Sequence, residues 1–439
     1  MMEQEQSRAK AAEKRRYRAP RGMRDVLPDE VPVWELLEDT ARRLARLHGY
    51  REIRPPLLEE TELFTRSVGE VTDIVEKEMF TIQRGESSLS LRPEGTAGVV
   101  RAYLEAGFAK TAPVQKLHYA GPMFRYERPQ KGRERQFTQW DVEALGSLDP
   151  RLDAEVVHLA ASFFEALGIQ GLEVRLNSMG EGADRDRYRD AVRGWLEPQM
   201  ERHCDLCRRR FERNVLRVLD CKNPTCIELH ADAPRILDHL AGENRDHFER
   251  VQGHLADLGR EPIVDPGIVR GMDYYTRTVF EVHYPQLTRS ALCGGGRYDH
   301  LIRDLGGPDL GAVGFAIGFT GTLIALDELG LLPAGGGEAV AAAYVVGTDP
   351  TTAGEVLRVA EELRAAGVAA VYDHEAKSLK AQMKSAGRGG HRLAAIVGPD
   401  EIASGTVQLK DLERGEQRAV PRAGLAEAAR ALLAGDGDR

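Results

Sequence analysis

The first 180 residues alternate between helical and strand patterns. Apolar residues recur at helical spacing over 31–48, and a second well-formed helical period covers 152–168. A third helix is predicted over 96–107. Strand patterns lie at 50–60, 80–95 (a hairpin), 116–127 and 172–178. We therefore expect a domain in which helices pack against a sheet.

The pattern changes at about residue 180. Residues 180–260 are rich in charge and helical period, and we interpret them as an inserted helical subdomain. Strand patterns return at 267–284 and 291–298, and the following residues predict a buried strand that runs into a helix. After a glycine-rich linker at 333–338, strands and helices alternate as in a small α/β domain.

Residues 125–143 combine a cationic loop with an alternating strand. The loop half holds five Arg and Lys residues among Pro129 and Gly132. In the strand half, one face would carry Phe137, Gln139, Asp141 and Glu143. An aromatic ring, an amide and carboxylates on one face, entered through an arginine loop, are typical of a nucleotide-using active site. The alternative is an exposed hairpin with a solvated run of charge.

Composition indicates a globular protein of more than one folding unit. The 439 residues are 42% hydrophobic and 29% charged, with a formal net charge of -9. The chain has no run of 18 apolar residues and no apolar signal core, so we expect no membrane span and a cytoplasmic location. Because the chain is acidic, nucleic acid would have to bind at local basic patches. Residues 1–18 predict a disordered basic tail.

One basic patch has helical spacing. Lys377, Lys380, Lys384 and Arg388 are three, four and four residues apart, which would place all four on one face of a helix. A solvated helix face normally mixes charges of both signs. We therefore predict a nucleic-acid-binding face here.

Four segments together resemble the histidyl-tRNA synthetase family of class II aminoacyl-tRNA synthetases. They are IRPPLLEETELFTRSVGEVTDIVEKEMF at 53–80, LRPEGTAG at 91–98, GPMFRYERPQKGRERQFTQ at 121–139 and VRGMDYYTRTVFE at 269–281. The resemblance extends over nearly all of 18–425, and the order and spacing of the segments make coincidence very improbable.

The resemblance implies a fold and a reaction. The fold is α+β: a catalytic domain over 19–332 built on an antiparallel sheet, with the helical insertion, and an α/β anticodon-binding domain over 339–435. The reaction joins L-histidine to histidine tRNA, using ATP with Mg²⁺ and passing through a histidyl-adenylate. The first-motif region, 34–60, would supply a homodimer interface.

The resemblance also implies roles for individual residues. Arg125 and Arg270 would flank the α-phosphate, where permanently charged guanidinium groups are well suited to stabilise the transition state. Further ATP contacts would come from Glu127, Arg133 and Phe137. The histidine-binding residues would be Glu94, Thr96, Gln139, Glu143, Tyr274, Tyr275, Gly294 and Gly295. The tRNA would contact Arg128 and Gln130 of the loop, and Lys377, Lys380, Lys384 and Arg388 of the C-terminal domain.

The third motif departs from the family pattern. It normally ends in Gly-Leu-Glu-Arg, but this chain has Thr320 and Gly321 at the glutamate and arginine positions. Losing that cation would weaken ATP binding by a few kcal/mol unless another residue substitutes. The alternatives are a non-aminoacylating paralogue that senses histidine for ATP phosphoribosyltransferase, or a tRNA-binding protein. The arginines of the second motif and the C-terminal domain favour the synthetase.

Four of the five cysteines form two close pairs. Cys204 and Cys207 are followed after thirteen residues by Cys221 and Cys226, and a structural zinc or simple burial as small apolar residues both fit this spacing. His203 and His230 are possible substitute ligands.

Overall fold

The computed structural model describes residues 17–69, 72, 74–269, 272–287, 291–333, 342–375 and 377–434. Contacts divide the chain into two units, Met1–Pro333 and Ala334–Arg439. The predicted basic tail and the predicted linker lie almost wholly outside the described residues.

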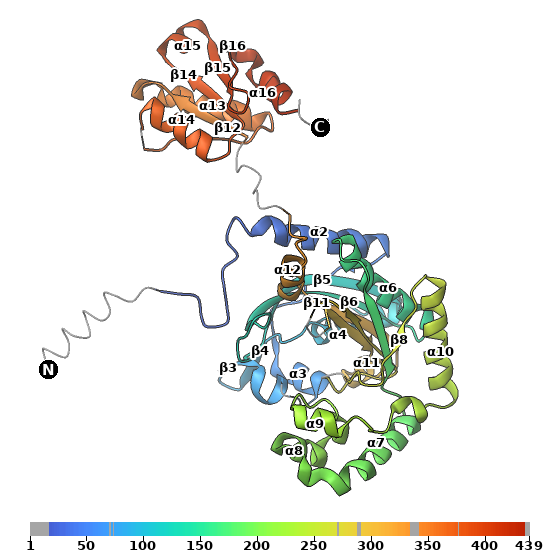
Figure 1. The fold of residues 1–439 in the computed structure, drawn as a ribbon. Helices are drawn as coiled ribbons and strands as arrows, with labels where there is room; N and C mark the ends of the chain where they lie inside the picture. The colour runs from blue at the N-terminus through green and yellow to red at the C-terminus, as the bar shows by residue number, and fades with distance from the viewer. Residues whose placement is uncertain are drawn as a thin grey trace, which may run out of the picture. The chain divides into compact units, whose positions relative to one another are not determined.

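The first unit is built on an eight-stranded sheet (Figure 1). Its spatial order is β1 (Arg51–Glu52), β5 (Gln115–Phe124), β6 (Gln136–Leu145), β11 (Ala312–Gly318), β10 (Cys293–Arg297), β9 (Thr278–His283), β7 (Glu173–Ser178) and β8 (Ile263–Val264). Neighbouring strands are antiparallel except at the two edges, where β1 pairs with β5 and β7 pairs with β8 in parallel. The predicted antiparallel sheet is confirmed.

One face of this sheet is covered by helices α2 (Val31–Leu47), α6 (Pro150–Ala166) and α12 (Phe319–Glu328). Helix α6 begins at Pro150 because Asp149 accepts a hydrogen bond from the Arg151 amide as its N-cap. The Trp140 ring of β6 lies 5.1 Å from Phe163 of α6 and 5.2 Å from Phe315 of β11, centroid to centroid. These aromatic contacts anchor the sheet to the helices.

A buried ion pair joins the same helix to β10. Arg297 and Asp153 are both fully buried, and the Arg297 Nε donates to Asp153 Oδ1 at 3.0 Å. Burial would raise the pKa of Asp153, but the charge and hydrogen bonds of Arg297 together with the contact from His247 outweigh burial and hold that pKa well below its usual range.

The opposite face carries polar side chains beneath α4 (Thr96–Glu105) and α11 (Leu301–Asp304). Along β6, Trp140 and Val142 pack with α6, whereas Asp141 and Glu143 point to the α4 side. The predicted alternation of this strand is therefore confirmed. Beside Glu143, the neighbouring strand β11 places Gly314, where a Cβ would collide with the Glu143 carboxylate and would lie 2.8 Å from the Tyr298 hydroxyl, so glycine leaves room for these two groups.

A three-stranded sheet borders the polar face. It consists of β2 (Leu58–Glu60), β4 (Ser87–Leu91) and β3 (Phe80–Arg84), and the β3–β4 pair confirms the predicted hairpin. Helices α3 (Thr61–Val68) and α5 (Phe108–Thr111) and the π-helical turn η1 (Ile74–Glu78) complete this region.

The segment between β7 and β8 is helical, as predicted for the insertion. It contains α7 (Ala183–Leu196), η2 (Glu197–Arg202), α8 (Asp205–Arg213), η3 (Val215–Val218), α9 (Pro224–Leu229), η4 (Ile236–Asp238) and α10 (Gly242–Asp257). In Figure 1, α7, α8 and α9 lie below the sheet and α10 runs beside it.

The second unit has a five-stranded sheet in the order β13 (Ala370–Tyr372), β12 (Ala343–Gly347), β14 (Leu393–Val397), β15 (Thr406–Asp411) and β16 (Gln417–Pro421). The first three strands are parallel and the last two antiparallel. Its helices are η5 (Pro350–Thr352), α13 (Ala353–Ala365), α14 (Leu379–Arg388), α15 (Pro399–Ser404), η6 (Arg422–Gly424) and α16 (Leu425–Ala434). Among the described residues, the elements absent from the predicted order are the short α15 and the two short helical turns η5 and η6. None of the helices in the described ranges is long and apolar enough to cross a membrane.

Candidate active site

Glu143 lies at the centre of the polar face of the sheet. Its side chain is 1% exposed, the Thr96 hydroxyl donates to its Oε1 at 2.6 Å, and the Tyr298 hydroxyl donates to its Oε2. Burial raises the pKa of Glu143 well above its usual value. Each carboxylate oxygen has more than one lone pair, so Glu143 can accept a further hydrogen bond from a polar ligand while both hydroxyls stay in place.

Asp141 lies two residues earlier on the same face. The Tyr119 hydroxyl donates to its Oδ2, and burial raises the pKa of Asp141 to about 7. Within the described part of the chain, Asp141 Oδ1 and Gln139 Oε1 are buried and have no hydrogen-bond partner. Because buried acceptors are nearly always satisfied, these two atoms indicate a place for a ligand that donates hydrogen bonds.

Glu94 approaches the same place from the start of α4. Its Oε2 accepts from the Thr96 amide at 2.8 Å and its Oε1 from the Ala97 amide at 3.1 Å. Burial raises the pKa of Glu94, and the two amide donors partly offset this rise. Residue 95 must be glycine, because a Cβ there would overlap the Tyr119 hydroxyl.

Three tyrosine rings close one side of the polar face. The Tyr274 centroid lies 4.8 Å from Tyr275 and 5.5 Å from Tyr298. Burial raises the pKa of Tyr274 and Tyr298 well above the usual value, so both hydroxyls stay protonated. The predicted residues Tyr274 and Tyr275 are thus brought to Glu143 through Tyr298, which no sequence pattern had singled out.

The two glycines predicted to line the histidine pocket differ in position. A Cβ at Gly295 would meet the Phe280 ring at 2.7 Å, on the face that the helices cover. Gly294 and Gly296 alternate with it, and a Cβ at Gly296 would meet the Tyr275 ring at 2.9 Å. Gly295 therefore packs on the helix side of the sheet, whereas Gly294 and Gly296 face the side of the tyrosines.

Arg125 and Phe137 lie at the entrance from the cationic loop. The Arg125 Nε donates to the Pro93 carbonyl at 2.8 Å, and its guanidinium lies 5.3 Å from the Phe137 ring centroid. This arginine also lowers the pKa of Glu94, although burial acts more strongly in the opposite direction. The guanidinium is therefore fixed next to the carboxylates, with Phe137 beneath it.

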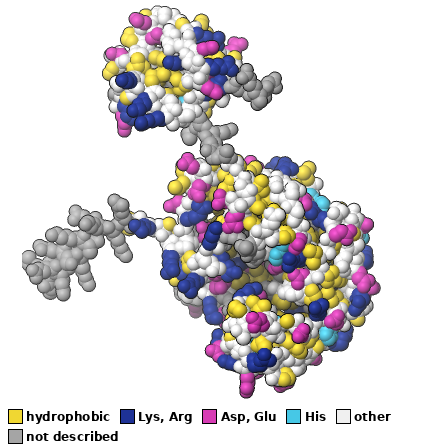
Figure 2. Space-filling view, viewed as in Figure 1, with side chains coloured by type: hydrophobic (Ala, Val, Ile, Leu, Met, Phe, Trp, Pro, Cys, Tyr) yellow, Lys and Arg dark blue, Asp and Glu magenta, His cyan; other side chains and the backbone are white. Residues whose placement is uncertain are grey.

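The remaining loop residues are more exposed. Arg133 is 59% exposed and its Nη1 lies 3.4 Å from Glu127 Oε2. Gln130 and Arg133 form an isolated β-bridge, and Arg128 is exposed. Arg270 lies outside the described residues. Figure 2 shows the surface of the first unit hollowed between the insertion and the sheet, with Lys and Arg side chains along its margin.

Thr320 and Gly321 occupy the first turn of α12, next to the start of β6. The Thr320 hydroxyl donates to Glu134 Oε2 at 3.0 Å, and Glu134 also lies 3.3 Å from the Arg24 Nε. A Cβ at Gly321 would meet no atom of the described residues within 4 Å. A larger side chain at position 321 therefore has room to extend.

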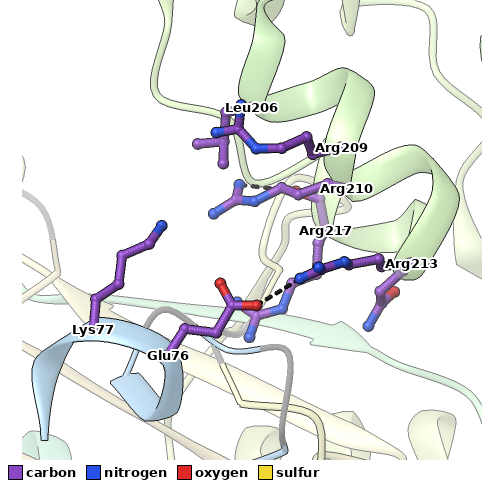
Figure 3. Close-up of a pocket in the computed structure, with 8 residues that line it drawn as sticks. Glu76, Lys77, Leu206, Arg209, Arg210, Arg213 and Arg217 are labelled. Atoms are coloured by element: carbon purple, nitrogen blue, oxygen red, sulfur yellow. Dashed lines mark hydrogen bonds and ion pairs between the residues drawn. The ribbon is translucent and has the colours of Figure 1, made fainter.

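Helix α8 of the insertion faces the turn η1 through arginines (Figure 3). Arg213 Nη1 contacts Glu76 Oε1 at 2.6 Å. The Asn214 amide donates to Asp273 Oδ1 at 3.2 Å, and the Arg217 Nε lies 3.5 Å from the same oxygen. A small cavity of about 50 Å³ at this junction is lined by Glu76, Lys77, Leu206, Arg209, Arg210, Arg213, Asn214 and Arg217. The insertion thereby contacts the residue that precedes Tyr274.

The structure corrects the predicted basic face of the second unit at Lys377, which does not lie on the helix. Helix α14 begins at Leu379 with Ser378 as N-cap, so Lys377 precedes the helix. The Lys377 ammonium contacts Glu375 Oε2 at 2.7 Å and Asp373 Oδ1 at 3.5 Å. The exposed residues Lys380, Lys384 and Arg388 follow at intervals of four on α14. The helical face therefore carries three of the four predicted cations.

The four paired cysteines of the insertion converge. The Sγ atoms of Cys204, Cys207, Cys221 and Cys226 all lie within 4.8 Å of one another. His203 and His230 contact each other, Nε2 to Nε2, at 3.1 Å.

Comparisons with known proteins agree with the resemblance found in the sequence. The family model described as histidyl-tRNA synthetase matches residues 22–180 and 211–321, and an anticodon-binding-domain model matches residues 341–432. The histidine–tRNA ligase of Moorella thermoacetica is 48% identical over 94% of this chain and 98% of its own length. That of Pelotomaculum thermopropionicum is 46% identical over 95% and 98%.

Solved structures show the same fold. Apo histidyl-tRNA synthetase from S. aureus matches with a TM-score of 0.79 and 33% identity, covering 94% of this chain and all of that one. A Bacillus halodurans protein titled as an ATP phosphoribosyltransferase regulatory subunit/histidyl-tRNA synthetase matches with a TM-score of 0.61. It is 22% identical, covers 87% of this chain and 98% of its own, and shows the fold alone.

Proposed function

The chain belongs to the histidyl-tRNA synthetase family, and we infer that it is a histidine–tRNA ligase that activates L-histidine with ATP and transfers it to histidine tRNA. The observation that carries this inference is the buried polar face of the sheet. There Glu94, Asp141 and Glu143 converge below Arg125, next to acceptors left open for a ligand. This face suits an amino acid that has an ammonium group and a ring with N–H donors.

In the first step, an oxygen of the histidine carboxylate forms a bond to the α-phosphorus of ATP. The bond from that phosphorus to the oxygen of the departing pyrophosphate breaks. The reaction requires ATP with a divalent cation, which neutralises charge on the phosphates. We propose that Arg125 and Arg270 stabilise the negative charge that develops on the oxygens of the α-phosphate. Because the Pro93 carbonyl holds Arg125 in place, little reorganisation of this residue is needed during the reaction.

Recognition of histidine is assigned to the carboxylates and tyrosines. Glu143, Tyr275 and the neighbouring Tyr298 would contact the imidazole, and Glu94, Thr96 and Gln139 would contact the α-amino and carboxylate groups. An apolar side chain of similar size would leave Glu143 without a ligand partner. A penalty of this kind supports discrimination of roughly 10⁴ without an editing site.

The nucleotide contacts are proposed for the loop and its strand. Glu127 would bind the adenine and ribose side, Phe137 would stack on adenine, and Arg133 would reach the outer phosphates. The exposed position of Arg133 and its long contact to Glu127 support a side chain that can reorient when ATP enters. Gln130 and Arg128 would then meet the acceptor end of the tRNA.

The paralogue alternatives for this chain are not favoured. Histidine–tRNA ligases 43–48% identical to it match across more than 90% of its length, including the second unit. The arginines of the loop are present despite the change to Thr320 and Gly321. The contact of Thr320 with Glu134 supports a reorganised start of α12 that still meets the loop.

Several wider expectations remain proposals. The second unit would bind the tRNA anticodon through Lys380, Lys384 and Arg388, with Lys377 nearby. A homodimer would form through residues 34–60, where Leu36, Leu47, Leu57 and Leu58 are exposed apolar side chains. The expected location is the cytoplasm. Structural zinc is a proposal for the insertion and not for this site.

Histidine-dependent exchange of pyrophosphate with ATP tests the function directly. We expect purified protein to exchange pyrophosphate only when L-histidine is present, and to charge histidine tRNA. Binding of histidine without exchange would support the sensor alternative. Binding of tRNA without exchange would support the tRNA-binding alternative.

A further inference from the structure

We propose that Cys204, Cys207, Cys221 and Cys226 bind one zinc ion in a tetrahedral site that shapes the insertion. A Zn–S bond of about 2.3 Å in a tetrahedron places neighbouring sulfurs about 3.8 Å apart. The Sγ atoms of Cys204 and Cys221 are 3.7 Å apart, and those of Cys207 and Cys226 are 3.8 Å apart. The chain has therefore placed these sulfurs at the spacing of zinc ligands.

A disulfide, ordinary apolar packing and an iron–sulfur cluster each fit the four cysteines less well than zinc does. A disulfide requires a sulfur–sulfur distance of about 2.05 Å, and the four residues are thiols in the described chain. Apolar packing would not require four sulfurs from separate turns to meet at one point. An iron–sulfur cluster would place inorganic sulfide between the ligands and hold the cysteine sulfurs farther apart.

Backbone amides around the sulfurs also suit thiolates. The Cys204 amide donates to Cys226 Sγ at 3.4 Å, and the Asn223 amide donates to Cys221 Sγ at 3.4 Å. Donors of this kind stabilise negative charge on metal-bound sulfur. His203 and His230 contact each other, and His203 Nδ1 contacts the Gln199 carbonyl at 3.1 Å. The geometry thus favours a four-cysteine site over one that includes histidine.

The sequence around the cysteines gives a physical reason for a metal. Helix α8 has nine residues, of which Leu206, Cys207 and Phe211 are the apolar members, and only Cys207 and Phe211 are buried. So short and polar a helix gains little from burial of apolar surface. A zinc ion that ties Cys207 to Cys226 of α9 would supply the missing constraint.

The proposed zinc site is connected to the proposed histidine pocket through side-chain contacts. Cys207 and Cys221 flank the stretch whose Asn214 and Arg217 contact Asp273. Asp273 immediately precedes Tyr274, and the Asp273 amide donates to the Val68 carbonyl at 3.3 Å. Zinc would therefore help to hold the tyrosine loop, a consequence that rests on the proposed function.

Metal analysis of the full-length protein tests the proposal. Protein purified without chelators should contain one zinc per chain, and Cys226→Ser should lose most of it. Cys293→Ser is the matched control, because Cys293 is a buried cysteine of β10 outside the cluster and its loss should leave the zinc content unchanged. Equal zinc loss in both variants, bound iron, or protein that neither contains nor takes up zinc would overturn the proposal.

A second measurement does not depend on the variants folding. Titration of the wild-type protein with a mercurial reagent should release one zinc as the cluster cysteines react. Co²⁺ taken up in its place should give the visible spectrum of a tetrahedral thiolate site. Thiols that react without metal release refute the site. In pyrophosphate exchange, zinc removal should raise the KM for histidine severalfold and change the KM for ATP less. If zinc is bound but its removal leaves the KM for histidine unchanged, the link between the zinc site and the histidine pocket is refuted and the zinc site itself is not.

Discussion

Glu143→Gln is the substitution that tests the proposed histidine pocket most directly. The change keeps the size of the side chain and removes its charge. In the structure both Glu143 oxygens accept hydrogen bonds, from Thr96 and Tyr298. In the glutamine variant one hydroxyl can still donate to the amide oxygen and the other can accept from the NH₂ group, but that NH₂ group cannot accept from an imidazole N–H.

The size of the effect follows from the hydrogen bond that is lost. A hydrogen bond to a charged group contributes about 1.5–3 kcal/mol, and each ~1.4 kcal/mol is tenfold in rate or affinity. We therefore expect kcat/KM for histidine to fall roughly 10- to 100-fold in pyrophosphate exchange. The KM for ATP should change much less, since Glu143 lies on the histidine side of the site.

Stability separates this effect from misfolding. Burial raises the pKa of Glu143, so ionised Glu143 is costly to bury and the neutral amide should leave the melting temperature equal or higher. Glu105→Gln is the control, because Glu105 lies at the end of α4 with a side chain that is 73% exposed and pairs with Arg101. If Glu143→Gln retains full kcat/KM for histidine, the assigned role is refuted.

Three further substitutions test other parts of the site. Arg270→Ala should nearly abolish adenylate formation in pyrophosphate exchange and leave tRNA affinity in filter binding largely intact; an unchanged exchange rate would contradict its role. Gly321→Arg should lower the KM for ATP severalfold, because a Cβ there meets open space, whereas Gly321→Gln should not; equal effects would show that charge is not responsible. Burial raises the pKa of Asp141 in the folded protein from 3.8 to about 7, so the folded state binds this proton more tightly than the unfolded state does. The contribution of Asp141 to the free energy of unfolding therefore falls as pH rises from about 4 to 7. Asp141→Asn should therefore flatten the pH dependence of the denaturation midpoint across that window, and an unaltered profile would contradict the shift.

Local patterns in the sequence predicted the elements that carry the site. The period-two alternation of 137–143 was sufficient to place Gln139 and Glu143 on one face of β6, and the strand pairing keeps that register. The helical period of 31–48 gave α2 nearly to its bounds. The charge spacing places Lys377 within a helix, whereas α14 begins at Leu379 because Ser378 is its N-cap, with a hydroxyl that accepts from the Ala381 amide at 3.4 Å.

Contacts between distant segments could not be predicted in this way. Tyr298 reaches Glu143 across 155 positions of sequence, and Asn214 reaches Asp273 from within the insertion. Neither residue has a periodic signal that distinguishes it from packing. Asp141 lay on the predicted face, but its role depends on the Tyr119 hydroxyl, which a neighbouring strand supplies. Such residues become visible only when the sheet order is known.

The grouping of Glu94, Asp141 and Glu143 explains why this site should favour an ammonium ligand. Two of these carboxylates raise the pKa of a neighbour: Glu94 acts on Asp141, and both act on Glu143, in addition to the larger effect of burial. Arg125 lowers the pKa of Glu94 and of Asp141 only in part. An α-ammonium placed among these acids would relieve their repulsion and favour their ionised forms. Binding of the amino acid would therefore offset part of the burial and repulsion that raise the pKa of these carboxyl groups in the empty pocket.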